Sequence, residues 1–261
     1  MNPNSSVDTI ETIDITDPQY QRSSKNKPEK TDKWSYPMIE DGWMHAHNSI
    51  RGEMRDIEEA MNAFEGNFPD GFTAWAIEVL KKVWCNHEIH IHSHHKNEDD
   101  IMTPYLKKRI NLPEKLEDDH LDIIDNMNNI RKSIENLKVG DSIDSVRAKF
   151  MSYKESMIPH LLEEEHIALP LMRAYFVPKE IDAKVQKIIL HQPKVEAGSF
   201  VYYQTPEHFK QSFMKQQKVP SFVWNLYFKP RYHYFIKNMI EPIKSLKDGV
   251  EPTKDVGCFS F

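Results

Sequence analysis

The sequence contains one pattern twice, because HHKNEDDIMTPYL (94–106) and HLLEEEHIALPLM (160–172) both read His-x3-Glu-x5-Pro. The residues of the pattern are His94, Glu98 and Pro104 in the first copy and His160, Glu164 and Pro170 in the second. A step of four residues is close to one helical turn, so the His and Glu of each copy lie on one face of a helix and can ligate one metal centre. The repeat therefore predicts two similar helices that share a metal site.

Apolar residues recur at intervals of three and four residues in four segments, which is the spacing of one helical face. The expected helices run from Asp41 to just before Gly66, from about 72 to 109, from Pro113 to Gly140, and from a cap at Asp141 or Ser142 to about 171. No segment shows the alternation of a β-strand. Short connections between long amphipathic helices favour antiparallel neighbours. The predicted fold is all-α, with an antiparallel up-down-up-down four-helix bundle.

Each copy of the repeat is preceded by a helix with a single histidine on its apolar stripe, His47 before the first and His120 before the second. Ligands from antiparallel helices must lie at one level along the bundle. Helix lengths on either side of the second turn match to within about 3 Å, and those of the first hairpin to within about two turns. The candidate metal ligands that converge in one layer are His47, His94, Glu98, His120, His160 and Glu164.

The donor set limits the metal that such a layer would hold. Four imidazoles and two carboxylates without a thiolate suit iron, manganese or zinc, whereas calcium and magnesium prefer oxygen ligands. Two carboxylates that can bridge favour a pair of ions. Without a cation, six buried polar groups would cost several kcal/mol.

The segments HNSIR (47–51), HHKNED (94–99), DHLDII (119–124) and HLLEEE (160–165) resemble the hemerythrin-like, or HHE cation-binding, domains. The likeness covers about 45–176. It implies a four-helix bundle that holds two non-haem iron ions, in preference to manganese or zinc, and that binds dioxygen or responds to oxygen and iron. It also implies that the six candidates are the ligands, with Glu98 and Glu164 bridging the irons.

The oxygen-carrying members place two histidines one turn apart on the third helix. This chain departs from them there, because the residue four positions after His120 is Ile124. The pattern is in this respect more similar to the intracellular iron- and oxygen-responsive members. His87 and His90 share the face of His94 and are expected to line an access path or to hydrogen-bond inward, with His90 as an alternative ligand. The side chains expected on solvated faces or as hydrogen-bond partners of the ligands are His92, His95, His166, Asp99, Asp100, Glu163 and Glu165.

The composition limits which partners and which cellular compartment are expected. The chain of 261 residues has a net charge of −6 without a basic block, so nucleic acid is not an expected partner. Two cysteines, Cys85 and Cys258, suggest neither a disulfide framework nor a thiolate zinc site, which fits a reducing compartment. The absence of a membrane span and of a signal peptide in the sequence predicts a cytoplasmic protein that does not associate with membranes.

We expect three regions: a disordered tail at 1–35, the hemerythrin-like bundle at 41–177, and an extension at 178–261 that packs on the bundle. The extension begins with a short helix around 180–190. Its aromatic segment 220–244 is expected to pack over the bundle, with a membrane-surface helix as the alternative, because its prolines should prevent one long helix. Cys258 lies where prenylation would need it, but Ser260 departs from that signal.

The sequence leaves three functional hypotheses open. The favoured one is a metal-binding protein that takes up dioxygen or a related small molecule, to sense, carry or buffer oxygen or iron. The second is an enzyme that handles oxygen, peroxide or nitric oxide, with proton donors such as His90, Tyr105 or Tyr153. The third is a structural module in which one zinc or manganese ion holds the helices and the extension binds a protein partner.

Overall fold

The computed structural model describes residues 13–23, 27–28 and 33–252. These residues form helices and no strand, apart from one isolated antiparallel bridge between Gln21 and Ile110. The all-α prediction is therefore confirmed. None of the described helices combines the length and the apolar content needed to cross a membrane.

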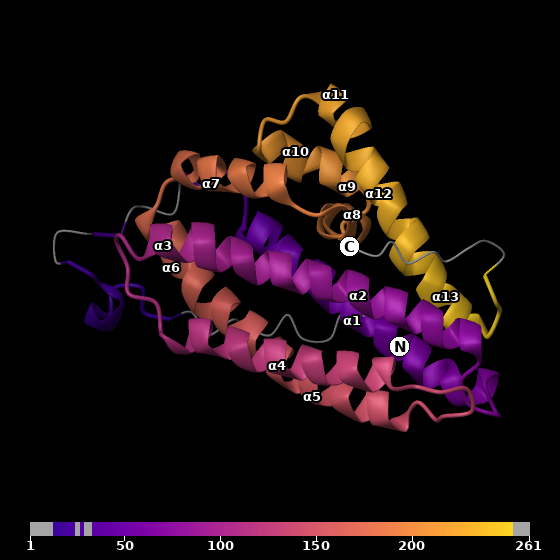
Figure 1. Cartoon of the computed structure of the whole chain (residues 1–261). Helices are drawn as coiled ribbons and strands as arrows, with labels where there is room; N and C mark the ends of the chain where they lie inside the picture. The colour runs from indigo at the N-terminus through magenta and orange to yellow at the C-terminus, as the bar shows by residue number, and fades with distance from the viewer. Residues whose placement is uncertain (1–12, 24–26, 29–32, 253–261) are drawn as a thin grey trace, which may run out of the picture.

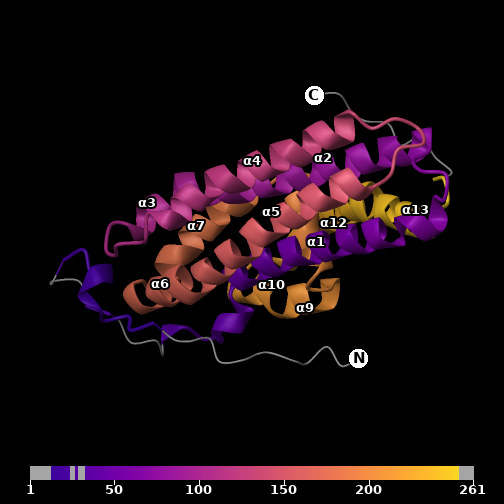
Figure 2. The same cartoon turned by 90° about the horizontal axis from the view of Figure 1, so that it is seen from below.

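Four long helices lie side by side in both views of the molecule (Figures 1 and 2). They are α1 (Gly42–Asn67), α2 (Ala74–Asn97), α4 (Lys115–Glu135) and α5 (Asp144–Glu163). Their apolar faces enclose one core, in which the predicted stripes meet as buried side chains. The stripe residues in that core are Ile50, Met54, Ile57, Met61, Leu80, Val83, Ile123, Met127, Ile130, Ile134, Val146, Phe150, Tyr153 and Met157.

Side chains cap two of these helices, because the Asp41 carboxylate accepts from Trp43 N–H and the Thr73 hydroxyl from Ala76 N–H. The prediction of a side-chain cap for α5 at Asp141 or Ser142 is wrong. That helix begins after Ile143 without a side-chain cap, and the Ser142 hydroxyl instead donates to the Asp144 carboxylate.

The two hairpin turns contact each other. Phe72 N–H donates to Asp141 C=O and Gly140 N–H donates to Phe72 C=O, each at 2.9 Å. Gly71 has a φ of 81°, and a Cβ there would lie 2.4 Å from the Gly140 carbonyl oxygen, so only glycine fits. The positive φ occurs at Gly71, and α1 ends at Asn67, slightly beyond the end before Gly66 that the sequence predicted. The contact fixes the two hairpins at a common level.

Helices α2 and α5 contain His94 and His160 near their C-terminal ends. Beyond each histidine the chain continues through a wide π-helical turn. The turn η4 (Glu98–Met102) leads into α3 (Thr103–Leu106), and η5 (Glu164–Ala168) leads into α6 (Leu169–Tyr175). Each π turn ends two residues before a proline, Pro104 or Pro170. Proline lacks an N–H donor and its ring clashes with the carbonyl four residues earlier, and a widened turn relieves this conflict without ending the helix.

The same kind of π turn occurs in the aromatic segment, where the prediction that prolines prevent one long helix is wrong. Residues 221–248 form one continuous helical run rather than separate pieces. Its parts are α11 (Ser221–Val223), η6 (Trp224–Phe228), α12 (Lys229–Phe235), η7 (Ile236–Ile240) and α13 (Glu241–Asp248). The π turns η6 and η7 end two residues before Pro230 and Pro242, so the helical run accommodates these prolines without breaking.

The remaining extension helices are α7 (Pro178–His191), α8 (Lys194–Tyr202), α9 (Pro206–Gln211) and α10 (Phe213–Gln216). The short helix expected around 180–190 is therefore present as α7. The extension lies over α1 and α2, on the side away from α4 and α5 (Figure 1), and α8 and α13 contact both covered helices. An aromatic cluster that includes Phe200, Phe209 and Phe228 joins its parts.

The described part of the predicted tail makes specific contacts with the rest of the chain. Ile13, Ile15 and Tyr20 pack against the buried cluster at the end of the bundle that holds α3 and α6. The Tyr175 hydroxyl donates to Ile15 C=O at 2.9 Å, and Asn111 N–H donates to Tyr20 C=O at 2.9 Å. These few apolar side chains pack against a cluster formed by residues distant in the sequence. Composition alone does not reveal such a contact. Residues 1–12, 24–26 and 29–32 of the tail, and Cys258, lie outside the described residues.

The crossing of α8 and α12 provides a test of how the extension packs. A Cβ at Gly198 would lie 2.3 Å from the Arg231 carbonyl oxygen and 2.6 Å from Phe235 Cβ, whereas a Cβ at Gly66 would meet nothing within 4 Å. We predict that Gly198→Ala lowers the free energy of unfolding by about 1–3 kcal/mol, because the backbone must move apart. The control Gly66→Ala should leave it unchanged or slightly raise it. Equal denaturation midpoints for the two variants would contradict the close crossing.

Candidate metal centre

The two glutamates of the repeat each occupy the first residue of a π turn, Glu98 in η4 and Glu164 in η5. His94 and His160 lie in the last α-helical turn before them, so His and Glu still point from the same side. π turns inside α-helices are frequent at functional sites. The repeated prolines of the sequence pattern therefore shape the backbone at the candidate ligands.

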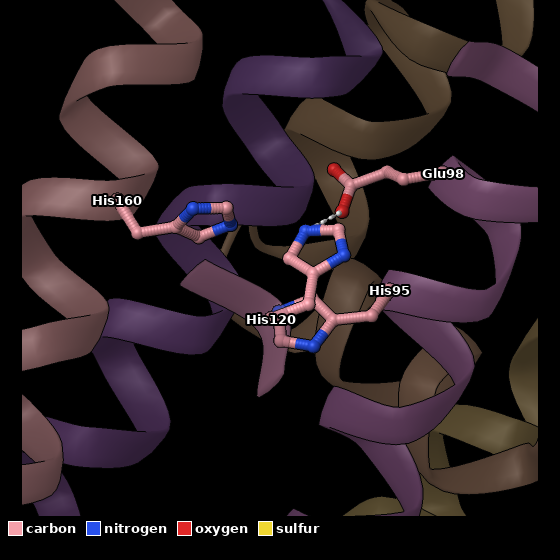
Figure 3. A group of neighbouring side chains, drawn as sticks. All are labelled: His95, Glu98, His120 and His160. Atoms are coloured by element: carbon pink, nitrogen blue, oxygen red, sulfur yellow. Dashed lines mark ion pairs between the residues drawn. The ribbon is translucent and has the colours of Figure 1, made fainter. Parts of the chain in front are cut away.

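The structure brings all six predicted residues into one buried region, as two groups that share Glu98. In the first group, ligand atoms of His47, His94, Glu98 and Glu164 lie within 4.8 Å of one another. The second group meets the same limit and consists of His95, His120, His160 and Glu98. Figure 3 shows the four side chains of the second group, which come from α2, η4, α4 and α5.

Both carboxylates span the two groups. Glu98 Oε1 lies 3.1 Å from His94 Nε2, and Glu98 Oε2 lies 3.6 Å from His120 Nε2. Glu164 Oε2 lies 3.2 Å from His47 Nε2, and Glu164 Oε1 lies 3.8 Å from His160 Nε2. Each glutamate thus directs one oxygen toward each imidazole group.

Many of these buried atoms have no hydrogen-bond partner among the described residues. They are His94 Nε2, both ring nitrogens of His95 and of His160, His120 Nε2, Glu98 Oε2 and Glu164 Oε2. Buried polar atoms in folded proteins are almost always paired, and leaving them unpaired costs about 1–3 kcal/mol each. Cations at the two groups would satisfy these lone pairs, so the residues fit a bound metal.

Burial and neighbouring charges shift the pKa values of the carboxylates and imidazoles in the centre. Burial and the neighbouring charge of Glu98 raise the pKa of Glu164 to about 7. Burial also acts to raise the pKa of Glu98, but His94 and His47 beside it hold that pKa well below its usual range. Burial lowers the pKa of His160 to about 4, and burial together with His120 keeps the pKa of His95 well below normal. Both imidazoles are therefore neutral at pH 7, with lone pairs free to bind a cation.

Outer side chains orient the imidazoles. His47 Nδ1–H donates to Glu165 Oε1 at 2.8 Å, and Arg51 holds both oxygens of Glu165 at 2.6 and 2.9 Å. His120 Nδ1–H donates to Asp99 Oδ1 at 3.1 Å. Such contacts fix the tautomer and leave the other ring nitrogen facing the site. The prediction that acidic neighbours of the glutamates serve as partners for ligand N–H groups is confirmed for these two.

His95 lies in a different environment from the one that the sequence predicts. It was expected on a solvated face or as a partner of a ligand, yet its side chain is only 2% exposed. Its ring stacks on that of His120 with centroids 4.1 Å apart. Consecutive residues on a helix point about 100° apart, so His94 faces one imidazole group and His95 the other. Two features of the sequence could have indicated this placement of His95. One is the adjacent pair His94-His95, and the other is Ile124, which stands where the oxygen-carrying members have a second histidine on the third helix.

His87 and His90 hydrogen-bond inward, as expected, but to a buried carboxylate outside the two groups. Glu53 Oε2 accepts from His87 Nδ1 at 2.7 Å, and Glu53 Oε1 accepts from His90 Nδ1 at 2.8 Å. The Tyr153 hydroxyl lies 2.9 Å from His87 Nε2. All four side chains are essentially unexposed. His90 therefore has its own partner and is not a member of the metal groups.

A mostly apolar cavity of about 100 Å³ borders the first group. It lies between α1, α2 and the extension helices α7 and α8. His94, Glu98 and Trp43 line it on the bundle side, and Val185 and Ile188 on the extension side. Trp43 Nε1–H also donates to His47 Nε2 at 2.9 Å, so the indole and a cation compete for the same lone pair.

Fold and site together define a class of helical protein. In this class, several long helices contribute imidazoles and carboxylates to a buried centre that can bind cations. The chain belongs to the hemerythrin family, because the family model described as hemerythrin HHE cation binding domain matches residues 38–172. That range contains all seven residues of the two groups, whereas α7 and the helices after it lie outside it. Comparison with curated proteins and with solved structures found no match.

The buried Glu53 pair generates a prediction about stability and pH. Burial would raise the pKa of Glu53, but His90 and His87 lower it from 4.5 to about 2, and Glu53 raises the pKa of His90 above 6.5 against the effect of burial. The Glu53 contribution to stability is lost as pH falls from about 4.5 toward 2, and the His90 contribution is lost as pH rises above 6.5 through its raised pKa.

We therefore predict that Glu53→Gln lowers the free energy of unfolding by about 3–5 kcal/mol, because it leaves a buried imidazolium without its counter-charge. The difference from the unsubstituted protein should be greatest between about pH 4.5 and 6.5. Denaturant titrations across pH measure it. The control is Glu59→Gln on the same helix, whose partner Lys247 is half exposed, and it should cost less than about 1 kcal/mol. A pH-independent cost for Glu53→Gln would contradict the charged pair.

Proposed function

We propose that the chain is a non-haem di-iron protein that binds dioxygen or a related small molecule, to sense, carry or buffer oxygen or iron. The observation that carries the proposal is the placement of Glu98 and Glu164, each with one oxygen toward each imidazole group. A carboxylate in that position is suited to bridge two ions. One ion could not use both groups, whereas two ions would use all seven side chains.

The donor set favours iron over hard cations. Five imidazoles and two carboxylates without a thiolate suit iron, manganese or zinc, and exclude a calcium or magnesium cage. Membership of the hemerythrin family supports iron among these three, with His47, His94, Glu98 and Glu164 around one ion and His95, His120 and His160, with the same two glutamates, around the other. Two ferrous ions held there would supply electrons for reversible uptake of dioxygen.

The two sides of the centre differ in a way that indicates where a small ligand would enter. One side offers three imidazoles, His95, His120 and His160, and the other offers only His47 and His94. The side with fewer imidazoles leaves more room for an external ligand, and its residue His94 lines the apolar cavity. An apolar cavity admits a small uncharged molecule and disfavours water and ions. The chain's own part is thus to bind and to keep the site dry.

An oxygen- or peroxide-handling enzyme is the second candidate, and the buried Glu53 network favours it. His90, one helical turn before His94, lies in hydrogen-bond contact with Glu53 and therefore holds a proton near the centre. Tyr153 is bound to His87 in the same network, whereas Tyr105 lies outside it. Steady consumption of peroxide by the iron-loaded protein would favour catalysis, and reversible binding of oxygen would favour carriage or sensing.

We also propose the regional organisation that serves this function. Residues 41–177 would form an up-down-up-down bundle, supported by the short connections at 68–73 and 136–143 and by the contact between these two turns. Residues 178–261 would form an extension that closes the cavity and offers a surface to a protein partner.

The first test is metal content with matched histidine variants. We predict about two irons per chain for the reconstituted protein, with near-ultraviolet charge-transfer absorption when oxidised. Glu98→Ala with Glu164→Ala should lower iron content and melting temperature together. His95→Ala should also lose iron, whereas His92→Ala, an exposed neighbour on the same helix, should retain it. A stable, iron-replete Glu98/Glu164 double variant, or one zinc per chain as the only metal bound, would refute the proposal.

The cavity yields a second test. Val185→Trp should fill the cavity from α7 and slow oxygen binding several-fold, without lowering the iron content. Gln186→Trp places the same side chain at the exposed neighbouring position and should change neither quantity. Stopped-flow mixing of the reduced protein with oxygen measures the rate. An unchanged rate for Val185→Trp would show that the ligand enters elsewhere.

A further inference from the structure

A second cluster of imidazoles and a carboxylate lies outside the centre described above and shares no residue with it. Its members are Glu40, His45 and His208, whose ligand atoms lie within 4.8 Å of one another. Glu40 ends the short helix η3 (Met38–Glu40), His45 lies in the first turns of α1, and His208 lies in α9. The cluster therefore joins the start of the bundle to the extension, which the family model does not cover.

The geometry centres on one carboxylate oxygen. Glu40 Oε2 lies 3.5 Å from His45 Nε2 and 3.0 Å from His208 Nε2. The two imidazole rings meet edge to face with centroids 5.7 Å apart. Around a tetrahedral zinc ion with bonds of about 2.0–2.1 Å, neighbouring ligand atoms are separated by about 3.3 Å. The two observed separations bracket that value.

His45 supplies an independent indication of a ligand. The residue is more than nine-tenths buried, at 8% exposure, yet its Nε2 has no hydrogen-bond partner among the described residues. This nitrogen faces the cluster, because Glu40 Oε2 is its near neighbour. An unpaired buried nitrogen is costly, and a cation at the cluster would remove that cost.

Neighbouring groups hold the three side chains in place. The Ser212 hydroxyl donates to Glu40 Oε2 at 2.7 Å, and this contact keeps the pKa of Glu40 below its usual range, so the carboxylate is charged at neutral pH. Thr205 caps α9 by accepting from His208 N–H, and it adopts a φ of 65° to do so. The ring of His45 packs edge-on against Phe200.

We propose that Glu40, His45 and His208 bind a divalent cation of the zinc class, with solvent at the remaining position. Two imidazoles and one carboxylate are donors that zinc and its transition-metal neighbours prefer, and they disfavour magnesium and calcium. The side chain of His208 is 43% exposed, so an ion and a water ligand can reach the site from solvent. The bound ion fastens α9 to the start of α1 and thus holds the extension over the bundle.

The test is zinc stoichiometry of the full chain by equilibrium dialysis and elemental analysis. His208→Ala and Glu40→Gln should each bind about one zinc ion fewer per chain than the unsubstituted protein. His191→Ala removes an exposed histidine of α7 and should bind the same number. The same one-ion difference should persist in a Glu98/Glu164 double variant, so failure of this site and failure of the di-iron centre give different results.

Stability provides the second measurement, because a ligand that binds only the folded state raises the melting temperature. In the Glu98/Glu164 double-variant background, zinc should raise the melting temperature with His208 present and with the His191→Ala control, but not after His208→Ala. His208 lies largely at the surface, so its variant is expected to fold. Equal zinc stoichiometry with and without His208 and Glu40 would overturn the proposal.

Discussion

The structure depends on one electrostatic constraint, the presence of five imidazoles and two carboxylates in a dry layer between four helices. Such groups are costly to bury unless a positive charge or a hydrogen bond compensates each of them. Glu165 with Arg51 and Asp99 compensate the outer nitrogens of His47 and His120, but most of the inward-facing atoms have no hydrogen-bond partner among the described residues. The inner layer is therefore built for cations, and the surrounding protein orients and covers it.

The prolines link the sequence to this layer. A proline stands six residues after each glutamate, and the wide turn before it begins at the glutamate itself, so the ligand pair and the proline form one structural unit. The long helix over residues 221–248 uses the same unit twice, at Pro230 and Pro242, without metal ligands. Pro159 lies inside α5 without such a turn, so the π turn is a feature of these four sites and not of every helical proline. It acquires a role at the centre because Glu98 and Glu164 occupy its first residue.

The sequence predicted the features that depend on local periodicity. The helical stripes follow from spacing alone, and the six candidate ligands follow from spacing together with the resemblance to the hemerythrin-like domains. The structure brings those six together. Three features escaped because tertiary contacts decide them: His95 turns inward to stack on His120, Ile13 and Ile15 pack against a distant cluster, and the helix of the extension continues through its prolines. The cavity also escaped prediction, because α7 and α8 complete it from outside the bundle.

Anomalous diffraction from crystals of the iron-loaded protein, recorded at the iron edge, would show whether two iron ions occupy the centre. We expect two peaks about 3.5–4 Å apart. One should lie beside His47 and His94, the other beside His95, His120 and His160, with Glu98 and Glu164 between them. A single peak at the centre, or two peaks without these glutamates between them, would contradict the di-iron proposal.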